Sequence, residues 1–185
     1  NVVDVVDGVK VTCMDVAMPM VIARAADFGL TGHESREDLD ANREFFARME
    51  AIRIKAGKLM GMGDVTKSVT PKFGLVAPPK NGGSVGVRYF MPWTAHPTMA
   101  VTGSQCLASC ALTPGSVAEG IIPNVPKVGP VTVVLEHPLG LMDVVIDYEI
   151  DGVDNVFNHI SAGVVRTCRK IAQGKVFVSK SIWEN

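Results

Sequence analysis

The feature that most constrains this chain is a long stretch without a single charged side chain. From Tyr89 to Ala118 the sequence holds no Lys, Arg, Asp or Glu, and its centre, residues 97–112, is rich in Ala, Ser, Thr, Gly and Cys. A helix with no charged face is buried on all sides, and small side chains let neighbouring strands approach its axis. The stretch therefore predicts a central helix wrapped by a sheet.

A membrane span is the other structure that such a length suggests. Polar side chains interrupt the stretch too often for a lipid-facing helix, and three prolines, Pro92, Pro97 and Pro114, bracket it closely. We therefore expect no membrane segment. The net charge of −1, from 18 basic and 19 acidic residues, also predicts no surface for nucleic acid or for an anionic membrane.

The remaining segments predict a mostly antiparallel sheet. Alternating or continuous apolar runs typical of strands occupy residues 9–13, 20–23, 72–77, 84–90, 131–136, 142–150, part of 156–168, and 175–178. We found no internal linker or repeat. The chain is thus expected to be a single α+β domain over residues 1–185, in which the sheet wraps around the buried central helix.

One amphipathic helix is predicted over residues 41–60, as a cover packed on the sheet. Its apolar residues recur at spacings of three and four, which places them on one face, and Asp40 or Asn42 can cap its start. The apolar face consists of Phe45, Met49, Ile52, Ala56 and Leu59.

The four cysteines, Cys13, Cys106, Cys110 and Cys168, form no C-x-x-C pair. Such sparse cysteines predict buried thiols in a reducing compartment, the cytoplasm or the mitochondrion. Cys106 and Cys110 share one face of the central helix, where we interpret them as small apolar residues rather than as metal ligands or reactive thiols. The four histidines show no metal-ligand spacing, so no metal site is expected.

The start of the central helix is a candidate anion-binding site. The first amide groups of a helix lack partners within it, and the helix dipole favours a carboxylate there. Residues 93–99 form this start, with Pro97 near the first helical position and with Thr94, His96 and Thr98 as polar neighbours. The alternative is that Thr94 or His96 simply caps the helix.

Two further segments are candidates for the same site. Residues 15–19 interrupt a strand pattern with a proline, which indicates either a bulge beside an active site or a plain bend. Residues 63–68 concentrate polar donors, and among them Lys67 either meets a substrate carboxylate or is an ordinary solvated lysine.

Taken in order, several motifs resemble the PrpF family, which includes methylitaconate and aconitate Δ-isomerases and oxalomesaconate tautomerases. The resemblance covers nearly the whole chain. Its motifs are Val11–Asp15 with Met18–Val21, Arg24–Gly32, Arg53–Gly57, Gly63–Lys67, Phe90–Pro92 with His96 and Ala100–Gly103, and Arg166–Thr167 with Gly174–Val178.

This resemblance implies a diaminopimelate-epimerase-like fold, in which two similar domains each wrap a sheet around a helix and enclose the active site between them. It also implies a proton shift in an unsaturated di- or tricarboxylic acid, without metal or organic cofactor. The catalytic thiol and lysine are expected in the first domain, whereas this chain resembles the second. By analogy, the substrate carboxylates are contacted by Met18, Pro19, His96, Thr98 and Met99.

Two departures from the family pattern bear on this expectation. Family members commonly read Asp-Asn-Gly-Met-Pro where this chain has Val16 and Ala17 in the middle, which leaves the substrate open. Related two-thiol epimerases place a cysteine just before the helix, and no cysteine lies between Cys13 and Cys106. An epimerase of another substrate class is therefore disfavoured, and a one-sided allylic proton shift fits better.

The sequence leaves two functions open. The first is an isomerase whose partner is a missing N-terminal half, with this chain inactive alone, because the chain lacks an initiator Met and is expected to begin within a longer protein. The second is a non-catalytic domain that binds small carboxylates or a protein. Apolar surface at the cleft would favour a homodimer.

Overall fold

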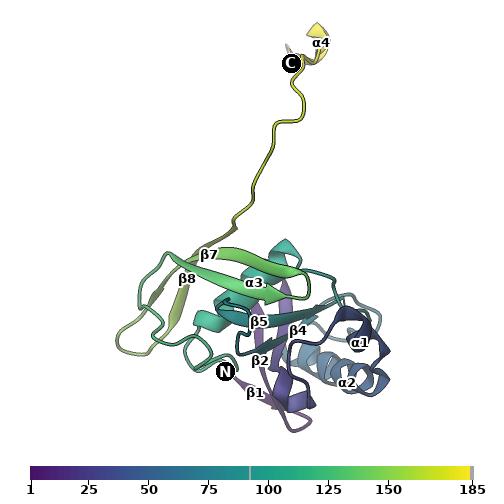
Figure 1. The fold of residues 1–185 in the computed structure, drawn as a ribbon, viewed down its shortest axis with the longest axis vertical. Helices are drawn as coiled ribbons and strands as arrows, with labels where there is room; N and C mark the ends of the chain where they lie inside the picture. Colours follow the sequence, from purple (N-terminus) through teal and green to yellow (C-terminus); the bar gives the residue numbers. More distant parts are fainter. Residues whose placement is uncertain (92, 184–185) are drawn as a thin grey trace.

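A computed structural model describes residues 1–91 and 93–183, so Pro92 lies outside the described residues. Its strands form one sheet whose order follows the chain (Figure 1). The strands are β1 (Asp4–Val6), β2 (Val9–Asp15), β3 (Pro19–Arg24), β4 (Lys72–Ala77), β5 (Val85–Phe90), β6 (Val131–His137), β7 (Gly140–Ile150) and β8 (Phe157–Val164). The helices are η1 (Ala25–Phe28), α1 (Arg36–Ala41), α2 (Arg43–Leu59), α3 (Val101–Leu112) and α4 (Lys180–Trp183).

The prediction of a mostly antiparallel sheet is confirmed. Five of the neighbouring strand pairs are antiparallel, and only β3–β4 and β5–β6 are parallel. Each parallel pair needs a crossover. The first crossover runs through η1, α1 and α2, and the second runs through α3.

The central helix is α3, and the sheet curves around it (Figure 1). Every strand from β2 to β8 contacts α3, and nine of its residues are buried. Small side chains make this possible, because a Cβ atom added to Gly103 would lie 2.4 Å from the Tyr89 ring. The absence of charge in this segment is thus explained by its enclosure.

The second helix, α2, covers the opposite face of the sheet. Alternate residues of β3 therefore face different cores: Met20 and Ile22 pack in the cluster around α3, whereas Val21 and Ala23 pack in the cluster around α2. Two covered faces explain why β3 reads as an unbroken apolar run.

The predicted amphipathic helix is confirmed, with one exception on its apolar face. Asn42 caps α2, because its side-chain oxygen accepts the N–H of Phe45 at 3.0 Å. Leu59, the last residue of the predicted face, is 62% exposed. It is also the last residue of the helix, where the chain turns away from the sheet.

The start of the central helix was predicted too early in the sequence. The helix begins at Val101 rather than near Pro97, after Ala100 in an extended conformation. The reason is a turn at the end of β5, where the N–H of Met91 donates to the carbonyl of Thr94 and the N–H of His96 donates to that of Tyr89. Met91 and residues 93–96 are thus held in a turn before the helix can begin.

The first and last predicted strands also need correction. Strand β1 was not predicted. It is followed by a tight turn in which Asp7 and Gly8 both adopt positive φ. Residues 175–178 form no strand. They belong to a segment, Val165–Trp183, that leaves the body (Figure 1) and is exposed along its length. We call this segment the arm.

The cysteine prediction holds for two of the four thiols. Cys106 and Cys110 are buried within α3, and burial raises the pKa of each thiol to about 12. Cys13 is only partly buried, and Cys168 is exposed because it lies on the arm. Among the described residues, no group of side chains could hold a metal ion, and no helix is long and apolar enough to cross a membrane.

Candidate functional site

The strand register brings the predicted site segments to the same end of several neighbouring strands. We call this end of the sheet the site edge. Strand β2 ends there at Asp15, opposite Pro19 at the start of β3. Strand β4 begins there at Lys72, and β5 ends there, because Phe90 pairs with Phe73. The start of α3 lies at the same edge, since Gly103 packs against Tyr89.

The break at residues 15–19 is the turn of the β2–β3 hairpin rather than a bulge within a strand. Ala17 adopts a left-handed conformation in this turn, with φ of 62°. The turn directs Met18 toward β5, where its Sδ accepts a hydrogen bond from the Tyr89 hydroxyl at 3.4 Å.

A short loop carries His96 from the end of β5 toward α3. The N–H of His96 donates to the carbonyl of Tyr89 at 2.8 Å, and the N–H of Ala95 donates to the Asp40 carboxylate at 2.7 Å. These bonds hold the loop over β5. The imidazole therefore lies edge-on to the Tyr89 ring, with the ring centroids 5.7 Å apart.

The imidazole of His96 is held in a defined tautomer. Its Nδ1 accepts the N–H of Thr98 at 3.0 Å, so in the neutral ring the hydrogen sits on Nε2, which can donate to a carboxylate. Burial lowers the pKa of His96 from its ordinary value of 6.5, the hydrogen bond from Thr98 opposes this, and the charge of Arg36 lowers it further. The environment of His96 thus favours the neutral ring.

The first turn of α3 presents backbone donors at the site edge. Ala100 precedes the helix without a side-chain cap, so neither Thr94 nor His96 caps it. The amides that begin a helix are not bonded within it, and they carry the positive end of its dipole. Thr98 and His96 lie just before these amides in the chain, which makes the start of α3 suited to an anion.

Tyr89 links these parts and was not singled out from the sequence. Its ring contacts Met18, His96 and Gly103, and its side chain is almost fully buried. Burial raises the pKa of Tyr89 to about 12, and the nearby Cys106 thiol adds to this. Its place near the end of a buried strand, at the start of the uncharged stretch, was the only signal available.

Several basic side chains lie toward the site edge. Strand β6 runs parallel to β5 and ends at His137, one residue beyond the Gly86–Glu136 pair. Burial lowers the pKa of this histidine, as do the charges of Arg88, Arg166 and His96. Lys72 begins β4 at the same edge, where burial and the charge of Arg53 lower its pKa. Lys67 lies in the loop that leads into β4, and it is exposed. Neither His137 nor Arg166 was singled out as a candidate from its pattern.

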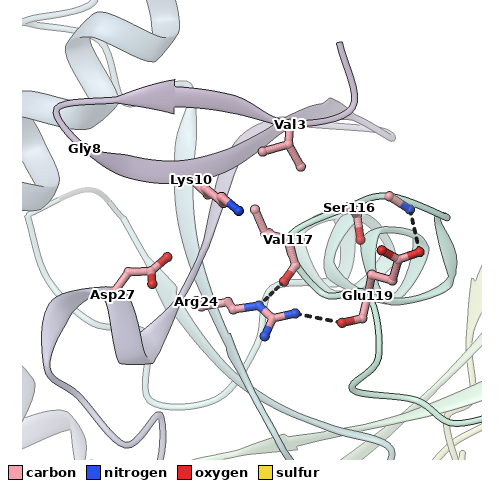
Figure 2. Close-up of a pocket in the computed structure, with 9 residues that line it drawn as sticks. Val3, Gly8, Lys10, Arg24, Asp27, Ser116, Val117 and Glu119 are labelled. Atoms are coloured by element: carbon pink, nitrogen blue, oxygen red, sulfur yellow. Dashed lines mark hydrogen bonds between the residues drawn. The ribbon is translucent and has the colours of Figure 1, made fainter.

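Hollows lie near both ends of α3. One of about 400 Å³ adjoins the β2–β3 turn and is lined by Asp15, Ala17, Gln105 and His159, among others. At the far end of α3 lie one of about 250 Å³, lined in part by Ala111 and Leu112, and a wider one of about 700 Å³. There Arg24 donates to the carbonyls of Val117 and Glu119 (Figure 2).

The start of α3 is a better candidate for an anion site than the wider hollow. In Figure 2 the guanidinium of Arg24 is directed at backbone carbonyls, so it fixes the loop after α3 instead of facing a ligand. The C-terminal end of a helix also disfavours an anion.

The predicted site residues differ in how they can act. Met18, His96 and Thr98 are brought together around Tyr89, and Pro19 begins β3 beside them. Met99 is 4% exposed and packs in the core around α3. Of Met99, therefore, only the backbone is placed to meet a ligand.

The chain matches the family model described as PrpF protein over residues 1–179. It is 47% identical over 178 residues to the (4E)-oxalomesaconate Δ-isomerase of Novosphingobium sp. strain KA1, covering 96% of this chain and 48% of that protein. It is 37% identical to the 4-oxalomesaconate tautomerase of Pseudomonas putida, covering 97% of this chain and 48% of that one.

The fold is similar to the crystal structure of a methylitaconate Δ-isomerase, with a TM-score of 0.74 and 25% identity over 89% of this chain and 49% of that one. The chain thus spans about half the length of the curated relatives that it matches. The expectation of an isomerase or tautomerase family is confirmed by these matches.

Proposed function

Because the chain belongs to the PrpF family, we propose that it supplies the substrate-binding second half of an isomerase that shifts a proton and a double bond in an unsaturated di- or tricarboxylic acid. The relatives named as isomerases of oxalomesaconate and methylitaconate support this substrate class. On this proposal the groups that transfer the proton come from the other half of the protein.

The observation that carries the proposal is the convergence of anion-binding groups at the start of α3. The first amides of the helix, the Nε2–H of His96 and the Thr98 hydroxyl belong to one short segment of the site edge. Removing a proton next to carboxylates builds negative charge on their oxygens, and fixed donors aimed at that charge lower the barrier.

Basic side chains near the site edge support an acid with more than one carboxylate. Lys72 begins β4 there, and fields of one sign concentrate oppositely charged substrates. His137 has a lowered pKa, so it would act as a neutral hydrogen-bonding group. The buried Cys106 and Cys110 have a raised pKa, so they are unsuited to act as bases near neutral pH. The resemblance to the PrpF family implies a catalytic thiol and lysine in the first domain, so we place the proton-transferring groups outside this chain.

An ultraviolet assay of the full-length protein with cis-aconitate and related unsaturated acids tests the proposal. We expect turnover by the full-length protein and none by residues 1–185 alone. Inertness of the full-length protein toward all unsaturated di- and tricarboxylates would instead favour the carboxylate- or protein-binding domain.

A His96→Ala variant of the full-length protein tests the site itself. Losing the donor at Nε2 and the acceptor for Thr98 should raise KM roughly tenfold, the equivalent of about one hydrogen bond. The matched control is His33→Ala, because His33 packs against Gly86, toward the other end of β5, and this variant should keep the wild-type KM. An unchanged KM in His96→Ala would remove His96 from the site.

A further inference from the structure

Asp40 has a different role from the one that its place in the sequence suggests. Either Asp40 or Asn42 could cap α2, and Asn42 does so. The carboxylate of Asp40 is therefore not used by the helix that follows it. It reaches instead to the loop between β5 and α3, where its Oδ1 accepts the N–H of Ala95 at 2.7 Å.

The N–H of Ala95 needs this partner. Ala95 is 1% exposed, and it pairs with Phe90 in an isolated antiparallel bridge. The next residue, His96, donates its N–H to the carbonyl of Tyr89 in β5, whereas the N–H of Ala95 turns to Asp40. A buried N–H without an acceptor is costly, so the bond to Asp40 fixes the residue next to His96.

The carboxylate of Asp40 is itself held in place. Its Oδ2 accepts the Nε–H of Arg36, one turn earlier in α1, at 3.2 Å. The two carboxylate oxygens thus have different partners, and the charged acceptor makes the bond to Ala95 one of the stronger kind. Arg36 is also close enough to His96 for its positive charge to lower the pKa of the imidazole, which places α1 beside the ring.

We propose that Asp40 is a positioning residue of the substrate site, which fixes the loop so that His96 stays near the start of α3 and can meet a substrate carboxylate. This inference rests on the proposed function. Asp40 lies on α1, outside the segments that the sequence indicated for the site, and it acts through the backbone of Ala95. Losing Asp40 should loosen the His96 donor without removing it, so the effect on binding should not exceed that of losing His96.

Kinetics of the full-length protein with cis-aconitate, or with the related unsaturated acid that it turns over fastest, test this role. Asp40→Ala should raise KM roughly threefold to tenfold, up to the value of about one hydrogen bond. The matched control is Asp38→Ala on the same helix, because Asp38 is exposed and accepts the Ser35 hydroxyl. This control should keep the wild-type KM. A KM that is unchanged in Asp40→Ala, or equally raised in both variants, would overturn the proposal.

A double-mutant cycle separates positioning from a general structural role. If Asp40 acts through His96, then Asp40→Ala adds nothing once His96 is alanine, and the double variant should have the KM of His96→Ala within about twofold. Independent effects would multiply instead and would overturn the proposal.

A conservative variant and a melting curve complete the test. Asp40→Asn keeps an oxygen that can accept the N–H of Ala95, so it should restore most of the wild-type KM. An asparagine variant as impaired as the alanine variant would show that the bond to Ala95 is not what matters. Alanine favours a helix, so Asp40→Ala is expected to fold. A variant that does not fold would make Asp40 structural and would also overturn the proposal.

Hydrogen exchange of the full-length protein, measured by mass spectrometry, gives a readout that does not depend on activity. The amides of Ala95 and His96 should exchange faster in Asp40→Ala than in the wild type, but not in Asp38→Ala. A protein that isomerises no unsaturated acid yet shows this faster exchange would overturn the proposed activity and keep Asp40 as the anchor of the loop. An active protein in which the exchange rises but KM does not would overturn the positioning role alone.

Discussion

The carboxylate of Glu136 holds the turn between β4 and β5. It is buried, and it accepts the backbone N–H groups of Lys80, Asn81 and Gly83 at 2.7, 2.6 and 2.7 Å. Replacing Glu136 by Gln sets an N–H₂ group against these donors, and an unsatisfied buried donor costs about 1–3 kcal/mol. We expect Glu136→Gln to lower the free energy of unfolding by that amount in urea titrations, whereas Glu149→Gln on the exposed side of β7 should not.

The pH dependence of stability gives Glu136 a second test. Burial alone would raise the pKa of this carboxyl, but the three backbone hydrogen bonds lower it below its ordinary value of 4.5. A lowered pKa adds stability above pH 4.5 that is lost as the pH falls through the lower, folded-state pKa. The wild-type chain should therefore lose more stability below pH 4.5 than Glu136→Gln does. Parallel curves for the two proteins would contradict this role.

Ala17 stores backbone strain in the β2–β3 turn. Its φ of 62° is left-handed, which costs a residue with a Cβ about 1–2 kcal/mol. Ala17→Gly should therefore raise the free energy of unfolding by up to about 1 kcal/mol, after the greater freedom of glycine in the unfolded chain is deducted. Ala51→Gly, within α2, should lower it by about 0.5–1 kcal/mol. The same sign for both substitutions would show that the turn is unstrained.

At the scale of elements, α3 depends on close approach to β5. Alanine is the better helix former by about 1 kcal/mol, yet Gly103→Ala would place its Cβ 2.4 Å from the Tyr89 ring. Overpacking typically costs about 1–3 kcal/mol, so we expect the variant to melt at a lower temperature than the wild type. A higher melting temperature would mean that helix propensity outweighs the contact and that Tyr89 yields easily.

The sequence predicted an element correctly where one physical requirement determined the composition of that element. Burial on all sides removed charge from α3, and burial on two faces made β3 continuously apolar. The start of α3 was predicted too early because Pro97 suits the first turn of a helix. The hydrogen bonds of Ala95 to Asp40 and of His96 to Tyr89 instead hold these residues in a loop. The hairpin of β1 was overlooked although Asp7-Gly8 is a strong turn signal.

The sequence predicted which segments form the candidate site, but it did not predict how these segments lie relative to one another. Residues 15–19 and 93–99 carried local signals of turns and of a helix start. Their meeting depends on the parallel pairing of β3 with β4 and on Tyr89, which no local pattern encodes. His137 and Arg166 reach the same edge only through the order of the last three strands.

In the whole molecule, the arm should add little to the stability of the body. Val165 donates to the carbonyl of Asp143 and Arg166 reaches Met142, but residues 165–183 are exposed throughout. A chain that ends at Val164 should therefore unfold with nearly the same free energy and the same m value, which scales with the surface exposed on unfolding. Urea titrations of the two chains check this. A loss of more than about 1 kcal/mol on truncation would mean that the arm packs on the body in solution.

A sheet whose strand order follows the chain has a consequence for synthesis. Each strand that leaves the ribosome can add to the one made just before it, but α3 is enclosed only when β7 and β8 arrive. That requires roughly 50 further residues, or about 3–10 s at ~5–20 residues per second. During this interval one side of the uncharged helix is not yet covered by strands. We therefore expect chaperones to bind the nascent chain before the domain is complete.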